Sequence, residues 1–400
     1  MHIGIDGRAL QDQPRGGVGH YTHELLRALF TLDHENEYVV WYNGLGKIVA
    51  PDFREYPNVR IYKTRWPNKI LNVSMWLFKW QFFSPLRLRG SKTGRASAGP
   101  GGEEGLRTSH NAPQPPLNLR GGDRVDIFFL PNPNFIALPP GVKLVAVAHD
   151  LSFEHFPDLL PLKSRLWHRA VNPRALFNRA DHIIAVSEHT KNDLIATYEI
   201  PATEVAVVHP GLTPITRYTP PATSYTPYML YLGALEPRKN IAGLIQAYEL
   251  LEPRETLMIA GLATPYVRHL KKRIAKSPFR TKITLIENPT EETKNALYAG
   301  ASLFVYPSFY EGFGFPPLEA MAAGVPVVAS SASSVREVCE DAALLVNPWN
   351  SAEIAQGIKI MLANETLRTR YIAAGKNRVR QFRWDTCARK VLNILHTLCT

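Results

Sequence analysis

Short apolar runs alternate with amphipathic segments along most of this chain, and the runs contain hardly any polar residue. Such runs are typical of strands that are buried on both faces of a parallel sheet. Strands are predicted at 2–6, 38–42, 125–130, 143–149, 182–187 and 205–209, then at 228–234, 256–261, 282–287, 302–308, 326–330 and 343–347. Helical periodicity at 22–30, 164–180 and 188–198 lies between strands. The pattern predicts two doubly wound, Rossmann-like α/β domains that face each other across a cleft.

Composition shifts set the domain boundaries. Residues 1–210 form the predicted N-terminal domain, and 211–227, rich in Pro and Thr, form a linker without periodicity. Residues 228–381 form the C-terminal domain, and 382–400 carry a helical pattern. Residues 88–122 are rich in Gly, Pro, Ser and Arg and are flanked by the near-copies PLRLRG and PLNLRG. That composition cannot bury enough apolar surface to order itself, so we expect a disordered surface insertion.

The segment 70–83, ILNVSMWLFKWQFF, is rich in aromatic residues and has no acidic residue. The simpler interpretation is a helix of the core or of the domain interface. The alternative is an interfacial patch by which the N-terminal domain contacts a membrane that carries its acceptor.

Composition and charge narrow the function. With 400 residues and 45% hydrophobic content, two cores are expected. The three cysteines lack CxxC or Cys/His spacing, which argues against a disulfide framework and a zinc site. We expect a cytoplasmic protein, since the N-terminus lacks a signal-peptide pattern and no apolar run approaches about 18 residues.

The net charge of +11 favours anionic partners: phosphorylated small molecules, acidic lipid headgroups or nucleic acid. Basic clusters such as 268–276 are more often solvated helix faces than binding sites. No nucleic-acid-binding motif accompanies them, so nucleic acid is not an expected partner.

The segment 307–330, PSFYEGFGFPPLEAMAAGVPVVAS, reads as the turn, helix and following strand of one α/β unit. Gly312 and Gly314 allow close backbone approach, and the helix start offers free N–H groups to a phosphate. Glu319 could accept hydrogen bonds from ribose hydroxyls, and Glu311 could reach a sugar beyond the phosphates. Alternatively, Glu319 complements the helix dipole and Glu311 is a solvated loop residue.

Glu311 and Glu319 fit the spacing E-x7-E, and EAMAAGVPVVAS continues with small residues and G-x-P-V-V. In this combination the chain resembles the retaining glycosyltransferases of the GT-B fold usually called family 4, over nearly all its length except the insertion. The resemblance implies a nucleotide diphosphate sugar as substrate and no further cofactor. It also implies that the C-terminal helix crosses back to brace the N-terminal domain. The donor contacts that it implies in this segment are Glu311, Gly312, Phe313, Gly314, Phe315, Leu318 and Glu319.

YLGALEPRKNIAGLI, residues 231–245, ends a strand at Gly233 and starts a helix near Asn240. Arg238 and Lys239 in the turn would place two cations over a diphosphate. The match to the family is close, and there the pair grips the diphosphate. Some members carry Arg directly after the strand's Gly, where this chain has Ala234, so that contact is missing. The alternative is an ordinary surface pair.

Three glycines, Gly16, Gly17 and Gly19, precede the helix expected from His20, where the backbone could pass close to the sugar and its phosphate. A dinucleotide-binding GxGxxG is excluded because Thr22 stands where the third Gly should be. The alternative is a plain helix-entry turn.

His149 and Asp150 follow a strong strand, at the edge where open α/β sheets bind ligands. The resemblance implies that His149 contacts the donor sugar and the reaction centre, and that Asp150 lies near the acceptor. Either residue could instead satisfy the loop backbone. Ser187 reads mainly as a helix cap, at a strand end that faces the acceptor side, and His209 reads as structural.

We therefore expect a cytoplasmic, retaining hexosyltransferase, with Glu311, His149, Arg238 and Lys239 as its catalytic residues. LGALEPRKNI and AHDLSF most resemble the bacterial mannosyltransferase branch of the family, which builds O-antigen or other surface polysaccharides. The resemblance implies GDP-mannose as the first donor, UDP-glucose as the second, and a glycan or lipid-linked saccharide as the acceptor. No D-x-D occurs, so a metal clamp is not indicated, and no dedicated general base is evident. A sugar-nucleotide epimerase and a non-catalytic polysaccharide binder are the rival interpretations.

Overall fold

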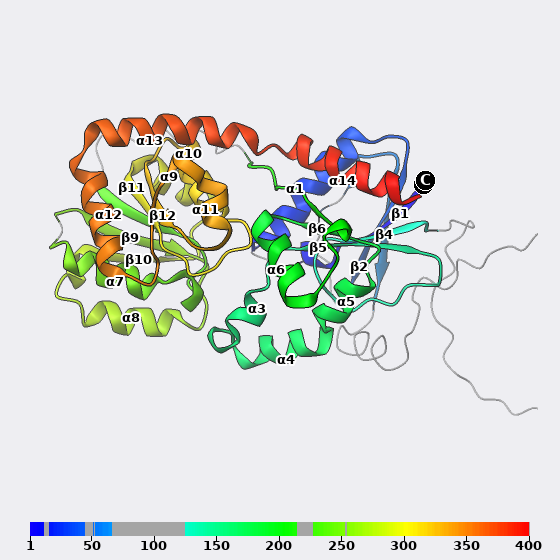
Figure 1. Ribbon diagram of the computed structural model, residues 1–400, viewed down its shortest axis with the longest axis horizontal. Coiled ribbons are helices and arrows are strands. Elements are labelled where there is room, and N and C mark those ends of the chain that lie inside the picture. Colours follow the sequence, from blue (N-terminus) through cyan, green and yellow to red (C-terminus); the bar gives the residue numbers. More distant parts are fainter. Residues whose placement is uncertain are drawn as a thin grey trace, which may run out of the picture.

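The computed structural model describes residues 1–11, 16–44, 51, 53–65, 125–213, 227–252 and 254–399. Two parallel sheets, one in each half of the chain, form two α/β domains side by side along the long axis of the molecule (Figure 1). This confirms the predicted fold class. The segment 70–83 and the insertion 88–122 lie outside the described residues, as do positions 214–226 of the linker.

The N-terminal sheet has seven described strands in the order β3-β2-β1-β4-β5-β6-β7, all parallel to their neighbours. Its strands are β1 His2–Asp6, β2 Glu37–Asn43, β3 Val59–Thr64, β4 Ile127–Leu130, β5 Lys143–Ala148, β6 His182–Ala185 and β7 Val205–Val207. Its helices are α1 Gly17–Leu32, α3 Ser152–His155, α4 Leu162–Val171, α5 Pro173–Arg179 and α6 Glu188–Tyr198. The residues of β4 and most of those of β1, β2, β5 and β6 are buried, as helices on both faces require.

The C-terminal sheet has six described strands in the order β10-β9-β8-β11-β12-β13, also parallel. Its strands are β8 Tyr228–Leu232, β9 Thr256–Gly261, β10 Ile283–Glu287, β11 Ala301–Tyr306, β12 Val327–Ser330 and β13 Leu344–Val346. Its helices are α7 Ile241–Leu250, α8 Val267–Ala275, α9 Glu291–Gly300, α10 Phe315–Ala322, α11 Ser333–Cys339, α12 Ser351–Ala363 and α13 Glu365–Arg378.

Each predicted strand is present within a few residues, but three local features differ from the prediction. Strand β3 was missed because it lies at the edge of the sheet and only its end residues, Val59 and Thr64, are buried. The helix predicted over 164–180 is two helices, because Asn172 adopts a left-handed conformation (φ 51°) before Pro173. Helix α1 begins at Gly17 rather than His20.

The last helix, α14 (Trp384–Cys399), leaves the C-terminal domain and lies along α1 of the N-terminal domain (Figure 1). A Cβ atom at Gly211 would meet the backbone nitrogen of Trp384 at 2.2 Å, so the returning chain needs a glycine there. The chain therefore passes between the domains twice, once after β7 and once between α13 and α14. None of the described helices is both long and apolar enough to cross a lipid bilayer.

Candidate active site

The loop between β11 and α10 carries the predicted donor-site residues. Gly314 stands before α10 with φ 106°, a backbone conformation that favours glycine, and Pro316 and Pro317 occupy the first turn. Gly324, with φ 80°, follows the helix before β12. The chain therefore forms the predicted strand, turn, helix and strand at the carboxyl edge of the C-terminal sheet.

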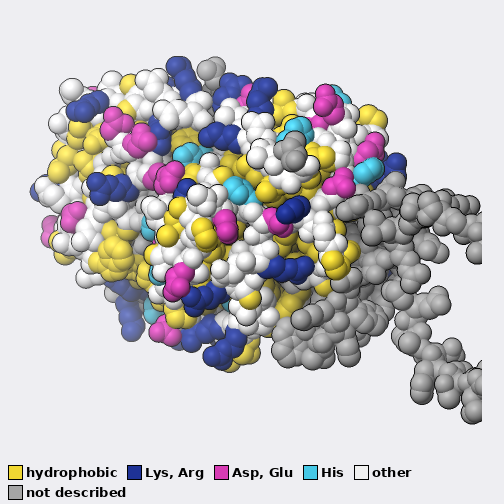
Figure 2. All heavy atoms as spheres, turned by 45° about the vertical axis from the view of Figure 1, so that its right-hand side comes forward, with side chains coloured by type: hydrophobic (Ala, Val, Ile, Leu, Met, Phe, Trp, Pro, Cys, Tyr) yellow, Lys and Arg dark blue, Asp and Glu magenta, His cyan; other side chains and the backbone are white. Residues whose placement is uncertain are grey.

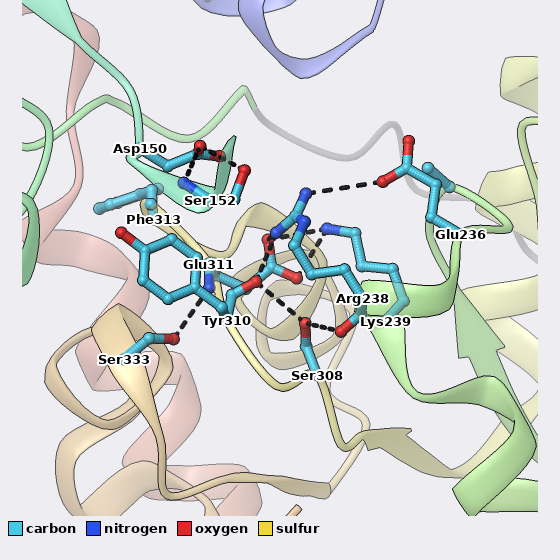
Figure 3. Close-up of polar contacts among 12 residues, drawn as sticks. Asp150, Ser152, Glu236, Arg238, Lys239, Ser308, Tyr310, Glu311, Phe313 and Ser333 are labelled. Carbon is cyan, nitrogen blue, oxygen red and sulfur yellow. Dashed lines mark hydrogen bonds and ion pairs between the residues drawn. The ribbon is translucent and has the colours of Figure 1, made fainter. Parts of the chain in front are cut away.

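Glu311 is the centre of a buried charge cluster (Figure 3). Its two carboxylate oxygens accept hydrogen bonds from the Lys239 ammonium group at 2.6 and 2.7 Å, and Arg238 Nη1 lies 3.2 Å from Oε2. The Tyr306 hydroxyl donates to Oε1 at 2.8 Å. In this arrangement the carboxylate predicted to reach a sugar is held by the two cations predicted to grip the diphosphate.

The electrostatics of the cluster favour an ionised Glu311. Burial acts to raise the pKa of this carboxyl, but the charges of Lys239 and Arg238 outweigh burial and lower it to about 2. Arg238 also interacts with the charges of Asp150 and of Glu236, which is 39% exposed and lies 3.6 Å away. Burial lowers the pKa of Lys239, and the charge of Glu311 acts against that shift. The two basic groups are therefore held by carboxylates whose place an anionic ligand could take.

Arg238 and Lys239 come from the turn that follows β8. They end a short 3-10 helix, Pro237–Lys239, and the left-handed Asn240 (φ 54°) then starts α7, as the sequence predicted. Arg238 Nη1 also donates a hydrogen bond to the carbonyl oxygen of Tyr310. Gly233 lies at the end of β8, so close to β9 that a Cβ at Gly261 would meet the Gly233 carbonyl oxygen at 1.6 Å.

The other residues of this domain that were predicted to contact the donor differ in how far their side chains are exposed. Glu319 is half-buried and accepts a hydrogen bond from the Tyr298 hydroxyl at 2.7 Å. Phe313 is 5% exposed and packs against the half-buried Phe315. Leu318 is fully buried in the hydrophobic core, so a donor contact there would come from its backbone.

In the N-terminal domain, Gly16 and Gly17 have open space where a Cβ atom would stand, and Gly19 is buried within the first turn of α1. His149 directly follows β5. Its Nε2 lies 2.7 Å from the Pro131 carbonyl oxygen, and burial lowers its pKa. Because a carbonyl only accepts hydrogen bonds, Nε2 carries the proton and neutral His149 keeps Nδ1 as an acceptor.

The two residues predicted for the acceptor side make internal contacts. Asp150 accepts hydrogen bonds from the Ser152 backbone at 2.9 Å and from the Ser152 hydroxyl at 2.7 Å. Ser187 is fully buried, accepts the Thr190 N–H as the cap of α6, and donates to the Gly312 carbonyl oxygen at 2.7 Å. Its hydroxyl therefore joins the two domains here and is not presented to solvent.

The domains meet directly at the site. A Cβ atom at Gly312 would lie 1.6 Å from the His149 carbonyl oxygen, so only glycine allows this approach. The Tyr310 hydroxyl donates to Asp193 of α6 and accepts the Leu151 N–H at 3.2 Å. Tyr310 thus touches the N-terminal domain with its hydroxyl and Arg238 with its carbonyl oxygen.

Glu337 of α11 makes a second interdomain contact. Its carboxylate accepts hydrogen bonds from the backbone N–H groups of Glu188 and His189, at 2.9 and 3.0 Å, at the start of α6. His209 Nε2 lies 2.8 Å from the same carboxylate, which fits the structural role predicted for this histidine. A carboxylate of one domain therefore caps a helix of the other.

Several site residues were missed from the sequence. Tyr306, Tyr310 and Glu337 are ordinary strand, loop and helix residues in the sequence. The partners of Tyr310 and Glu337 across the domain contact lie 117 and 149 residues away. Only Tyr310 had a signal, because it directly precedes Glu311. Among the described residues, no group of three or more His, Cys, Asp or Glu side chains could hold a metal ion.

Two family models match most of this chain. The model of the glycosyl transferases group 1 family matches residues 220–378, and that of glycosyltransferase family 4 matches residues 95–214. O-antigen chain mannosyltransferase B of Escherichia coli is 34% identical over 278 residues, which are 65% of this chain and 72% of that protein. O-antigen chain mannosyltransferase RfbU of Salmonella typhimurium is 29% identical over 209 residues, which are 51% of this chain and 58% of that protein.

Solved structures show the same fold at low sequence identity. Sucrose-phosphate synthase from Thermosynechococcus elongatus superimposes with a TM-score of 0.71 at 18% identity, covering 100% of this chain and 99% of its own. Anabaena HepE in complex with UDP-glucose gives a TM-score of 0.66 at 18% identity, covering 99% of this chain and 100% of its own.

Proposed function

Because the chain belongs to the group 1 glycosyltransferases, we propose that it transfers mannose from GDP-mannose to a glycan or lipid-linked saccharide, with retention of the anomeric configuration. The acceptor belongs to O-antigen or a related surface polysaccharide, the product class named for two similar proteins. UDP-glucose is the alternative donor, and one solved relative binds it.

The observation that carries this proposal is the buried cluster of Glu311, Lys239 and Arg238 at the carboxyl edge of the C-terminal sheet. On donor binding, the diphosphate would take the two cations and the N–H groups at the start of α10, and Glu311 would turn to hydroxyls of the sugar. Glu319 would hold the ribose through the carboxylate oxygen that Tyr298 leaves free.

The chemistry then follows from charge. As the glycosidic bond to the diphosphate breaks, negative charge grows on the leaving oxygen, and Arg238 and Lys239 stabilise it in a site from which water is excluded. Removing one such preorganised charge typically costs about 100- to 1,000-fold in rate. The acceptor would attack from the face that the diphosphate leaves, and the leaving phosphate oxygen would take the acceptor proton. Neutral His149 would contribute Nδ1 as an acceptor for a sugar hydroxyl.

In this proposal two side-chain cations carry the charge of the diphosphate, so no metal ion is required. Turnover should accordingly be unchanged in EDTA. A loss of activity in EDTA that Mg²⁺ or Mn²⁺ restores would overturn metal independence while leaving the donor assignment standing.

A donor screen tests the proposal. We expect GDP-mannose to raise the thermal unfolding temperature more than other GDP- and UDP-sugars do, and to be hydrolysed slowly without acceptor. Lys239→Ala and Glu311→Ala should abolish turnover in folded protein, whereas Lys272→Ala, which changes an exposed lysine of α8, should not. Stabilisation by no activated sugar, or near-wild-type turnover in either site variant, would refute it. Release of an epimerised sugar nucleotide would favour the rival epimerase.

A further inference from the structure

Helix α4 of the N-terminal domain exposes two leucines on one face. Leu162 is 71% exposed and Leu166 is 57% exposed, and they stand four residues apart, which places them one turn apart on the same side. The other large hydrophobic side chains that are exposed in the described part of the chain are on separate elements: Leu250, Leu262, Trp349 and Ile360. The pair therefore forms a small apolar strip that no described residue covers.

Cations surround this strip. Lys163 and Arg169 are exposed at helical spacing beside the leucines, and residues 162–179 contain five Lys and Arg and no acidic residue. Two of those cations are paired, Arg165 with Asp158 at 3.1 Å and Arg174 with Glu199 at 3.7 Å. Lys163 and Arg169 have no ion pair within the described residues. We call Leu162, Lys163, Leu166 and Arg169 the α4 surface.

The opposite side of α4 is packed, so the exposure of the α4 surface is not a sign of loose structure. His168 stacks on Phe153 of α3 with ring centres 4.3 Å apart and an interplanar angle of 10°. Val171, on the same packed side, is buried. The helix is therefore anchored by the side opposite to its leucines.

The position of α4 links it to the site. It follows α3 in the chain, and α3 starts two residues after Asp150, which we expect on the acceptor side. Figure 1 shows α4 at the lower edge of the N-terminal domain, with the cationic α8 at the lower edge of the other domain. In Figure 2, turned about the vertical axis, Lys and Arg side chains gather along the same lower rim.

We propose that the α4 surface docks the N-terminal domain on an anionic lipid bilayer, with Leu162 and Leu166 in the headgroup boundary and Lys163 and Arg169 on the lipid phosphates. Cations beside exposed apolar residues on one helix face are what binding at such an interface requires. α8 adds long-range attraction from the second domain through exposed cations such as Arg268 and Lys272. The purpose of docking, to bring the enzyme to a lipid-linked acceptor, rests on the proposed function; the docking itself does not.

Vesicle sedimentation with the full-length protein tests the docking. We expect binding to phosphatidylethanolamine vesicles that contain a quarter phosphatidylglycerol, weak binding to phosphatidylcholine, and release by salt. Lys163→Gln/Arg169→Gln should weaken binding roughly five-fold for each cation removed, and Leu162→Ser/Leu166→Ser at least tenfold. The matched controls are Leu250→Ser, a leucine 58% exposed on α7, and Lys359→Gln/Arg370→Gln, exposed cations of α12 and α13.

A fluorescent label locates the contact. Cys399 is the exposed cysteine and the other two are buried, so Cys399→Ser provides a background for single labels. A polarity-sensitive label at Leu166→Cys should shift to the blue on anionic vesicles, and the same label at Leu250→Cys should not.

Four results would overturn the proposal: no binding of wild-type protein to anionic vesicles, equal binding to neutral vesicles, α4 variants that bind like the controls, or no label shift at position 166. Self-association in the absence of lipid that the leucine variants abolish would assign the α4 surface to a second copy instead. Slow hydrolysis of GDP-mannose without acceptor should be unchanged in the α4 variants. A failure of donor hydrolysis in wild-type protein would therefore count against the proposed function and not against docking.

Discussion

Replacing Glu311 with Gln tests the charge balance of the buried cluster. The amide keeps the shape of the side chain and one acceptor oxygen but removes the negative charge between Lys239, at 2.6 and 2.7 Å, and Arg238, at 3.2 Å. The side chains of these three residues are only 8 to 14% exposed, so water cannot replace the lost carboxylate. Lys239 would then be buried without an acidic partner, and Arg238 would keep only weaker ones such as the more exposed Glu236.

The expected loss is several kcal/mol. Removing one partner of a buried ion pair typically costs about 3–5 kcal/mol. A second route agrees: the pKa of Glu311 is lowered from 4.5 to about 2, and at about 1.4 kcal/mol per unit this corresponds to about 3 kcal/mol. A loss of that size should lower the unfolding temperature of the C-terminal domain by about 10 °C.

Scanning calorimetry of wild type and Glu311→Gln at pH 7 measures this loss. The matched control is Glu236→Gln, which makes the same chemical change in a carboxylate 3.6 Å from Arg238 that is 39% exposed, and it should cost less than about 1 kcal/mol. The double variant Lys239→Met/Glu311→Gln should regain most of the stability that Glu311→Gln loses, because it also removes the buried ammonium group that had lost its acidic partner. Equal losses in Glu311→Gln and Glu236→Gln would refute the reasoning.

The pH dependence gives an independent check. Because the folded-state pKa of Glu311 is depressed, its contribution is fully present above the unfolded value of 4.5 and is lost as pH falls toward about 2. The stability difference between wild type and Glu311→Gln should therefore shrink as pH falls from 5 to 3. A difference that stays constant over this range would mean that the carboxylate does not act through its charge.

The other predictions concern the contact between the domains. Gly312→Ala places a Cβ atom 1.6 Å from the His149 carbonyl oxygen, so it should hold the domains apart. We expect a larger radius of gyration in small-angle scattering and at least 100-fold slower transfer. The control Gly17→Ala places its Cβ atom in open space and should leave the radius of gyration unchanged. Tyr310→Phe loses the bond to Asp193 and should lower kcat about tenfold with GDP affinity within twofold, whereas a parallel loss of GDP binding would contradict an interdomain role. Burial acts to raise the pKa of Glu337, but hydrogen bonds from His209 and two backbone N–H groups leave it below its ordinary value. The contact of Glu337 with the start of α6 should therefore weaken below about pH 4.5, and small-angle scattering should show the wild-type domains moving apart in acid. In Glu337→Gln the domains should already be apart at pH 7, with no further change down to pH 4.

The sequence by itself determined the α/β architecture and the local frame of the donor site. Buried strands appear as short apolar runs, and glycines and prolines mark the turn that starts α10, because these signals depend on neighbours within one element. For the same reason the pattern placed Arg238 and Lys239 in the turn before α7. It misjudged elements whose local pattern is weak, such as the half-exposed edge strand β3.

Only the tertiary structure decided which side chains meet. Lys239 reaches Glu311 across 72 residues, and Glu337 caps a helix whose first residue is 149 positions earlier in the chain. No periodicity encodes such contacts, because they depend on how two strand ends lie side by side and how two domains pack. The sequence assigned Ser187 to the acceptor side, and the fold buries it against Gly312. The exposure of Leu162 and Leu166 was equally hidden, since an apolar residue on a helix is ordinarily buried, and only the packed structure shows a face left uncovered.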